Sequence, residues 1–341
     1  MRKLLGFILI LFLFSLPLFA AATGKISFME GKVNHRDKAG KITDARIGQD
    51  IFTDDTLITG LNGYCEVEME NGSVITLNND TVFTFGEIED KEEKGKKRNI
   101  FSCIFGSADF KFKKFTGKEP YIATPSTICG VRGTDFTVIA GADGSSMYVV
   151  ASGEVYVEAG GNGVSLLPDE GVKVKAGQKF EVKRDSVNYN KILQESEALF
   201  LTDPAANMND LITLLKGYAS DAKYWDTLRL ENIDKVMAAR EQAVKIKEEQ
   251  GDKAWEDFIN TQVSPLEIDT SYLRLNARHY SVSALSMRRY IVSYMYIIMR
   301  TRYVLKTDSP EYIKFIEKYK EFMVIFNRDI VEPGYIFEGD F

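Results

Sequence analysis

The spacing of apolar residues changes once along this chain, near residue 184, and that change limits the folds open to it. From Gly24 to about Lys183, short β-branched or aromatic runs are broken roughly every 8 to 12 residues by Gly, Asn or Asp. After about Asp185 the apolar residues recur at helical spacing. The sequence therefore predicts an α+β chain with two segregated domains, the first all-β and the second all-α.

The clearest strand pattern is a hairpin. Residues 65–70 alternate strictly between apolar and polar, Asn71-Gly72 follows, and residues 73–77 give a second short strand. Asn-Gly tolerates the positive φ of a type I′ turn, so we predict a two-residue turn. Strands with one apolar face need a second layer, which favours a sandwich or a compact solenoid of short strands. Similar alternation recurs at Ala108, Phe110, Phe112, Phe136 and Val138, with Asp143-Gly144 as a further turn.

The helical part contains two clear amphipathic stripes. Leu211, Leu214, Leu215 and Tyr218 form one, and the other runs from Tyr312 to Phe326. Before the second stripe stand Ser309, Pro310 and Glu311, which suit the N-cap, the first helical position and the first turn. Further helices are predicted over residues 187–201, 224–249, 252–260 and 272–305.

The first 22 residues predict export. Arg2 and Lys3 precede an apolar run, Leu4–Phe19, and Ala20-Ala21-Ala22 supplies small residues for cleavage. A retained membrane anchor is the alternative, but the run is shorter than the roughly 20 residues that a span needs. We therefore expect a signal peptide over 1–22, a β-domain over 23–183 and an α-helical domain over 184–341. The expected location is the periplasm or another exported compartment, with no transmembrane segment after cleavage.

Charge and cysteine content narrow the partners. The formal net charge of −6 lacks the basic excess that captures nucleic acid, so nucleic acid is not an expected partner. Cys65, Cys103 and Cys129 are an odd number for an exported chain, which leaves one disulfide with a free thiol as one interpretation. Three small buried apolar residues are the favoured interpretation, since Cys65 falls on the inward phase of a strand.

The residues give no complete catalytic constellation. His35 and His279 fall in different predicted domains, so a His-based metal site or triad cannot be assembled from them. Glu66 and Glu68 lie on the outward face of the hairpin, where solvation is a simpler interpretation than glycoside hydrolysis. We predict no enzyme activity, no cofactor and no metal.

Tyrosine and arginine are concentrated in the helical part. Tyrosine suits a protein interface or a sugar-stacking groove, but at helical spacing it more often faces a core. The arginines of the predicted helix 272–305 either meet anionic envelope material or pair with carboxylates of their own domain. Contact with a glycan through the helical domain therefore stays open. These arginines are Arg274, Arg278, Arg288, Arg289, Arg300 and Arg302.

The segment 123–136 is not explained by periodicity. Pro125 excludes a central ladder position, and Gly130 and Gly133 flank Arg132 and permit a bulge or a close backbone approach. Asp135 can reach Arg132, so the residues favour an Arg–Asp lock, with Arg132 binding a ligand anion or a partner carboxylate as the alternative. The candidate structural or binding residues are Thr124, Pro125, Gly130, Arg132, Gly133, Thr134, Asp135 and Phe136.

This segment resembles the signature of FecR domains, the periplasmic sensing modules of cell-surface signalling systems. Thr124-Pro125 and Gly130–Phe136 carry the resemblance, and flanking pieces extend it in the right order over about residues 24–183. The resemblance implies an all-β, non-catalytic domain that works by protein contact. Sensors of that family place a cytoplasmic anti-sigma segment before a membrane span, whereas export is expected here from residue 4. The helical part lies outside the resemblance, and Cys129 stands where a small apolar residue is expected. The flanking pieces are Gly31–Val33, Ile51–Gly60, Glu66–Leu77 and Val174–Gln178.

The sequence thus favours an exported, non-enzymatic FecR-like protein that acts as a protein-binding or scaffold module in the bacterial cell envelope. Its partner would be an envelope protein that the sequence does not identify. The alternative is the periplasmic sensing component of a signalling relay that works through a separate membrane partner. A third hypothesis, an envelope polysaccharide-cleaving enzyme, remains because carboxylates are abundant.

Overall fold

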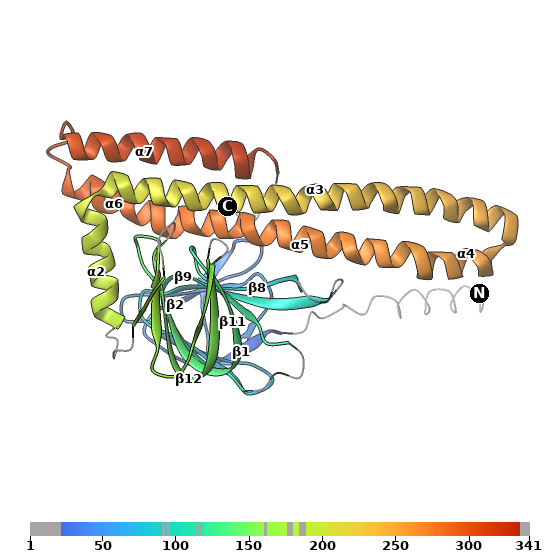
Figure 1. Ribbon diagram of the computed structural model, residues 1–341, viewed down its shortest axis with the longest axis horizontal. Coiled ribbons are helices and arrows are strands. Elements are labelled where there is room, and N and C mark those ends of the chain that lie inside the picture. The colour runs from blue at the N-terminus through green and yellow to red at the C-terminus, as the bar shows by residue number, and fades with distance from the viewer. Residues whose placement is uncertain are drawn as a thin grey trace, which may run out of the picture.

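A computed structural model describes residues 22–90, 93, 96–113, 115, 118–159, 162–175, 180–183 and 189–334. The expected signal peptide falls outside the described residues except for Ala22. The described chain consists of a β-region, which contains all the strands, followed by a helical region (Figure 1). The predicted α+β class, with strands and helices segregated along the chain, is therefore confirmed.

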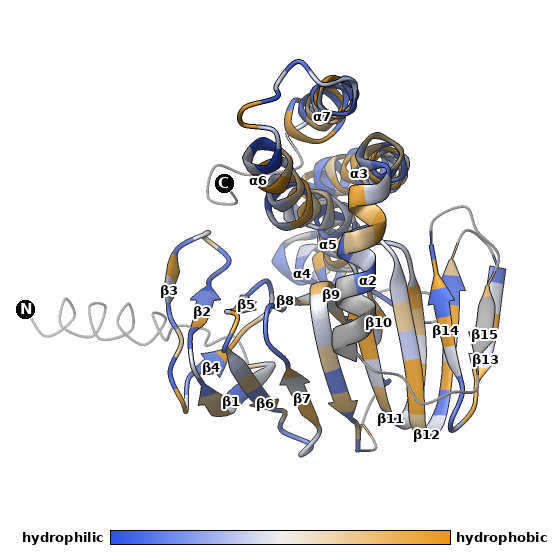
Figure 2. Cartoon of the chain, turned by 90° about the vertical axis from the view of Figure 1, so that its left-hand side faces the viewer, coloured by the Kyte–Doolittle hydropathy of each residue, from blue (hydrophilic) through white to orange (hydrophobic). Residues whose placement is uncertain are grey.

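The β-region is one largely antiparallel sheet with β9 at its centre, because β9 pairs with β7, β8, β10 and β11. Figure 2 shows the first seven strands and the last five on opposite sides of this region. The strands are β1 (Gly24–Glu30), β2 (Val33–Arg36), β3 (Ile42–Asp44), β4 (Asp50–Ile51), β5 (Thr56–Thr59), β6 (Tyr64–Glu68), β7 (Val74–Leu77), β8 (Val82–Glu89), β9 (Lys97–Lys111), β10 (Tyr121–Ala123), β11 (Ile128–Ala140), β12 (Ser146–Ala159), β13 (Asn162–Leu166), β14 (Gly171–Val174) and β15 (Glu181–Lys183).

One large hydrophobic core holds the two sides of the β-region together, and a small second cluster lies between β8, β9 and β10. The large core runs from Ile26 on β1 to Val174 on β14. The predicted alternation at Ala108, Phe110 and Phe112 is confirmed, since all three side chains are buried. Burial of the apolar face of such strands is what an alternating sequence predicts.

The predicted hairpin is present, but its turn differs from the expectation. β6 and β7 pair in register up to Glu68 and Val74, and the amide of Met69 donates to the carbonyl of Ser73 at 2.9 Å. The loop therefore holds three residues, and of these Gly72 takes positive φ (+74°). A type I turn followed by one left-handed glycine gives this loop, so the predicted two-residue type I′ turn was wrong. Asp143-Gly144 forms a turn as predicted, between β11 and β12.

The helical region contains the predicted amphipathic helices, but two of the predicted helices form one continuous helix. Ser309 caps α7 through its side chain, which accepts from the amide of Tyr312, as the sequence predicted. The stripe at 211–218 and the predicted helix 224–249 belong to one helix of 47 residues, not two. The elements are α2 (Tyr189–Thr202), α3 (Pro204–Gln250), α4 (Asp252–Phe258), π-helical turn η1 (Ile259–Val263), α5 (Ser264–Ser286), π-helical turn η2 (Met287–Val292), α6 (Ser293–Arg302), α7 (Pro310–Phe326) and π-helical turn η3 (Asn327–Val331).

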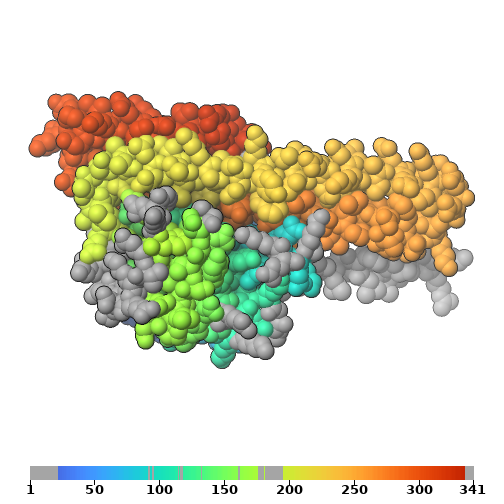
Figure 3. All heavy atoms as spheres, viewed as in Figure 1, coloured from blue at the N-terminus to red at the C-terminus, as the bar shows by residue number. Residues whose placement is uncertain are grey.

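α3, α5, α6 and α7 lie as a layer across one end of the β-region, and α2 runs down beside it (Figure 1). α7 packs along the first half of α3, and α5 packs antiparallel along α3 for most of its length. The distal halves of α3 and α5, with α4, reach beyond the β-region as a two-helix arm (Figure 3). Within the described residues, no helix is both long enough and apolar enough to cross a bilayer.

Candidate functional site

Thr124 and Pro125 lie in a tight turn between β10 and β11, outside the ladder. The amide of Thr124 donates to the carbonyl of Thr127 at 2.9 Å, and the amide of Thr127 donates to Thr124 Oγ1 at 3.1 Å. Pro125 has no amide hydrogen to lose at this place, which is why a proline fits the turn. We call residues 124–127 the TP turn.

Hydroxyl groups behind the TP turn form a continuous buried chain. Thr124 Oγ1 and Thr127 Oγ1 lie 2.6 Å apart, and Thr127 Oγ1 lies 2.6 Å from Tyr148 Oη. On the other side, Ser146 Oγ lies 2.6 Å from both Thr124 Oγ1 and Ser126 Oγ. Because buried hydroxyls are costly when unpaired, this chain fixes the conformation of the turn.

Burial keeps the groups around this chain neutral. The pKa of Tyr148 is raised well above its ordinary value, first by desolvation and then by the nearby Cys129. Desolvation also raises the pKa of the Cys129 thiol. The hydroxyl chain therefore carries protons for hydrogen bonding but offers neither a phenolate nor a thiolate for chemistry at neutral pH.

The helical region binds the TP turn directly. Tyr218 Oη on α3 donates to the carbonyl of Pro125 at 3.0 Å and lies 3.5 Å from the carbonyl of Thr124. The ring of Tyr218 also packs near Tyr280 of α5, with centroids 6.4 Å apart. Sequence reasoning had assigned Tyr218 to an apolar stripe, so its role at the TP turn was missed.

The second half of the candidate motif forms a β-bulge. The register between β11 and β12 shifts between Arg132 and Asp135, where Gly133 takes a φ of +54°. Opposite the bulge, Gly153 takes a φ of +80°, and a Cβ there would lie 2.5 Å from Thr134 Cγ2. Glycine is therefore required at position 153 by both conformation and space.

The other motif residues have structural positions. Phe136 stacks on Phe110 at 4.7 Å inside the core, and the carbonyl of Thr134 accepts from the amide of Phe112. The amide of Asp135 donates to Ser152 Oγ at 3.2 Å. Gly130 sits in regular ladder with open space where a Cβ would be, so the expected close approach does not occur there.

The predicted Arg132–Asp135 lock cannot be placed, because the side chain of Arg132 lies outside the described residues. Its backbone pairs with Glu154 of β12. The structure thus places the candidate residues in the TP turn and along β11, the strand that follows the turn and contains the bulge. The lock and the binding of a partner carboxylate stay predictions.

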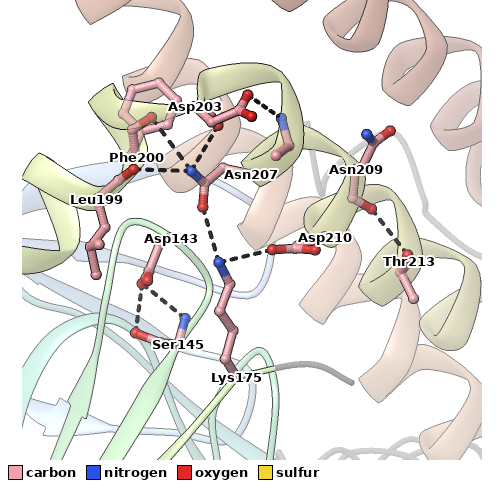
Figure 4. A network of polar contacts seen from close by, with 11 residues as sticks. Asp143, Ser145, Lys175, Leu199, Phe200, Asp203, Asn207, Asn209, Asp210 and Thr213 are labelled. Atoms are coloured by element: carbon pink, nitrogen blue, oxygen red, sulfur yellow. Dashed lines mark hydrogen bonds and ion pairs between the residues drawn. The ribbon is translucent and has the colours of Figure 1, made fainter. Parts of the chain in front are cut away.

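Other polar contacts join the two regions on either side of the TP turn. Lys175, which follows β14, reaches α3, where its Nζ lies 2.9 Å from Asp210 Oδ2 and 3.3 Å from Asn207 Oδ1 (Figure 4). The side-chain nitrogen of Asn207, Nδ2, donates to three carbonyls around the junction of α2 and α3, including that of Asp203 at 3.0 Å. Asp203 in turn caps α3 by accepting from the amide of Ala206.

α5 makes further contacts with β8 and with the loop between β4 and β5. The amide of Glu89 donates to Asn276 Oδ1 at 2.9 Å, and Arg278 Nε lies 3.3 Å from Asp54 Oδ2. The Arg278 contact pairs an arginine of the predicted helix 272–305 with a carboxylate, though one from the β-region. The helical region is therefore fixed to the β-region through α3 and α5.

The two histidines lie near two adjacent residues of the β-region, Asp55 for His35 and Asp54 for His279. His35 Nε2 lies 2.8 Å from Asp55 Oδ2 within the β-region. His279 lies between α5 and β8, where desolvation lowers its pKa to about 4 and leaves the ring neutral at pH 7. In the parts of the chain that the structure describes, no group of His, Cys, Asp and Glu side chains is arranged to hold a metal ion.

The cysteines and tyrosines mostly serve packing. All three cysteines are free thiols buried in the β-region core, as the favoured interpretation held. Tyr296 stacks on Tyr319 at 4.6 Å and Tyr303 on Tyr312 at 5.7 Å, which joins the end of α6 to α7. These four tyrosines face helix packing; contact with a glycan stays a prediction.

Comparison with protein families identifies the segment around the hairpin. Residues 55–156 match the family described as FecR protein. The chain carries a FecR domain. The matched segment begins just before β5 and ends within β12, so it contains the TP turn and the bulge. The FecR resemblance drawn from the motif is thereby confirmed for this segment.

Solved structures similar to this chain resemble only part of it. Two crystal structures of a protein from Parabacteroides distasonis ATCC 8503, described as a "putative anti-sigma factor", are 19% identical over 40% of this chain, with a TM-score of 0.31. The chain covers 62% of that protein, less than two thirds of its length. A structure described as "Cell surface anchoring domain" is 24% identical over 18% of this chain and 83% of its own, with a TM-score of 0.18. No curated protein matches the chain.

Proposed function

We propose that this chain is an exported, non-enzymatic FecR-domain protein that binds another protein of the cell envelope through its two-helix arm. The observation that carries the proposal is the hydrogen bond from Tyr218 to Pro125. Because the TP turn of the FecR domain is already bound by α3, the domain and the helices act as one unit. The surface left for a partner is then the arm that extends beyond this contact.

The arm presents an apolar row on α3. Leu230, Met237 and Val244 are each more than half exposed and stand seven residues apart. Apolar residues repeated every seven positions lie along one face of a helix, as the residues at one heptad position do in a helix–helix contact. Such a row on a soluble surface marks an interaction site for another helix.

The first half of α3 supports a helix as the element that covers this row. Met208, Ile212, Leu215 and Ala219 belong to the same core cluster as Phe322 of α7, and α7 packs along that half of the helix. On a helical wheel of 100° per residue, these positions share a face with Met237. The open row therefore continues a face that is covered by a helix nearer the β-region, so we propose an amphipathic helix of the partner as its occupant.

Site-specific photo-cross-linking in cells tests this proposal. A photoreactive residue at position 237 should capture one partner, and the same residue at Leu61, an exposed apolar position of the β-region, should not. The charged variant M237E should abolish capture at a neighbouring probe, position 244, without lowering the melting temperature. Equal capture from positions 61 and 237, or capture that survives M237E, would refute the arm as the binding surface.

A second candidate function is sensing in a signalling relay. The FecR match over residues 55–156 favours it, since the resemblance drawn from the motif implies a sensing module of a signalling system. This role requires that the captured partner span the membrane and that its output change when M237E blocks capture. A partner without a membrane span would instead support a scaffold.

The absence of enzyme activity is part of the proposal and has its own test. Glu66, one of the outward carboxylates of the hairpin, accepts a hydrogen bond from Tyr64 Oη at 2.7 Å. Incubation of the chain with purified cell-wall glycan should release no products. Product release that disappears in E66Q would show a polysaccharide-cleaving enzyme.

A further inference from the structure

The turn between α6 and α7 holds two of the most exposed apolar side chains of the helical region. Leu305 is 93% exposed and Val304 is 65% exposed. Figure 2, which faces this end of the helical layer, shows a hydrophobic stretch in the turn between hydrophilic ones. We call residues 300–308 the α6–α7 tip.

The tip is held in a defined conformation. The amide of Tyr303 donates to Met299, that of Lys306 to Tyr303 at 2.9 Å, and that of Ser309 to Lys306 at 3.1 Å. Tyr303 is turned inward and stacks on Tyr312 of α7. Because Tyr303 anchors the tip, the next two residues, Val304 and Leu305, stand outward on successive tight turns.

Cations flank these apolar side chains in the sequence. Arg300 and Arg302 end α6, and Lys306 follows Leu305 directly. All three are exposed, and no ion pair joins them to other side chains within the described parts of the chain. Asp308 is the one carboxylate within the tip, so the tip carries an excess of positive charge.

We propose that the α6–α7 tip binds the surface of an anionic phospholipid membrane, with Val304 and Leu305 entering the headgroup–acyl boundary and the cations contacting phosphates. Apolar side chains at the apex of a turn, flanked by Arg and Lys, are suited to an interface that is apolar inside and anionic at its surface. A protruding tip fits a soft planar surface, whereas the flat helical row of the arm fits another helix. The proposal thus concerns a different surface from the proposed protein site.

Vesicle flotation of the chain recovered after export tests the proposal. The chain should float with vesicles of phosphatidylethanolamine and phosphatidylglycerol and not with phosphatidylcholine vesicles, and added salt should weaken binding. V304N/L305N should reduce binding by about tenfold or more, given the apolar area that it withdraws. R302Q/K306Q should remove the preference for phosphatidylglycerol.

Controls separate the tip from other surfaces. L61N exchanges an exposed apolar residue of the β-region and should leave flotation unchanged, as should M237E on the arm. Size-exclusion chromatography with light scattering should give the same mass for the parent chain and V304N/L305N. Unchanged flotation of V304N/L305N overturns the proposal, and so does a change in mass, which would make the tip a contact between two copies. If V304N/L305N no longer captures a partner in the photo-cross-linking experiment but still floats with vesicles, then the tip is a protein-binding site and the proposal fails.

Discussion

Replacing Tyr218 by Phe removes one hydroxyl from the contact between α3 and the TP turn and leaves the ring in place. The lost hydrogen bond is the 3.0 Å donation to the carbonyl of Pro125. Burial raises the pKa of Tyr218 well above its ordinary value, so this hydroxyl donates throughout the neutral range. Because the carbonyl is left without this donor, we expect Y218F to cost about 1–2 kcal/mol.

The effect should appear both in global stability and at the TP turn itself. A loss of this size lowers the melting temperature by roughly 2–4 °C per kcal/mol for domains of this size. Hydrogen exchange should also become faster at the amide of Thr127, which donates within the turn. Y224F is the matched control, since Tyr224 is an exposed tyrosine on the same helix.

The outcome separates a formed contact from an incidental one. If Y218F and Y224F give equal melting temperatures and equal exchange at the TP turn, then α3 does not hold the turn in solution. The proposed unit of FecR domain and helices would then be wrong. A loss in Y218F that grows steeply across the neutral pH range would also refute the reasoning, because a neutral phenol should not titrate there.

Three further predictions follow from single residues of the structure. G153A should destabilise the chain by about 2–3 kcal/mol, because the added Cβ meets Thr134 in addition to the strain of a positive φ. G48A has the same φ of +80° but open space around the Cβ, so it should cost about 1 kcal/mol. Equal losses of unfolding free energy in urea would disprove the crowding at Thr134. Burial lowers the pKa of His279 from 6.5 to about 4, so the unfolded chain binds this proton at a higher pH than the folded chain does. The contribution of the neutral ring to the free energy of unfolding is therefore complete above pH 6.5 and is lost as the pH falls towards 4. H279Q should lose this part of the acid dependence of stability. An acid slope that is unchanged in H279Q would contradict this. The buried thiols of Cys65, Cys103 and Cys129, whose pKa values are raised by burial, should resist iodoacetamide in the native chain and react on unfolding. Mass spectrometry counts the labelled thiols, and rapid labelling of the native chain would contradict the raised pKa values.

The division into strands and helices was predictable because burial leaves a period in the sequence. Phe110 and Phe136 are spaced for a strand, and Phe322 for a helix, and each lies in the predicted core. The three-residue hairpin turn was not predictable, since it depends on Gly72 alone taking positive φ. The continuity of α3 through Gly217 was not predictable from the stripe, because glycine has a low helix propensity and packing against α5 and α7 keeps the helix continuous.

The candidate site was predictable only where its residues are local. Thr124 and Pro125 gave a turn, and Gly133 gave a bulge, because each residue type restricts its own backbone. The partner of the turn was not predictable, since Tyr218 lies 93 positions from Pro125 and local periodicity gave it only a place in the core. A hydrogen bond between residues so far apart in the chain produces no periodic pattern in the sequence.

Because α3 is one continuous helix, a tilt of its axis near the TP turn also moves its far end. From Tyr218 to the end of the helix at Gln250 the axis runs about 48 Å at 1.5 Å per residue. A tilt of about 5° at Tyr218 would therefore move the far end by about 4 Å, roughly the width of one side chain. A small adjustment of the FecR domain at this turn is thus enlarged at the far end of the arm, where it becomes large enough to make or break a contact between helices.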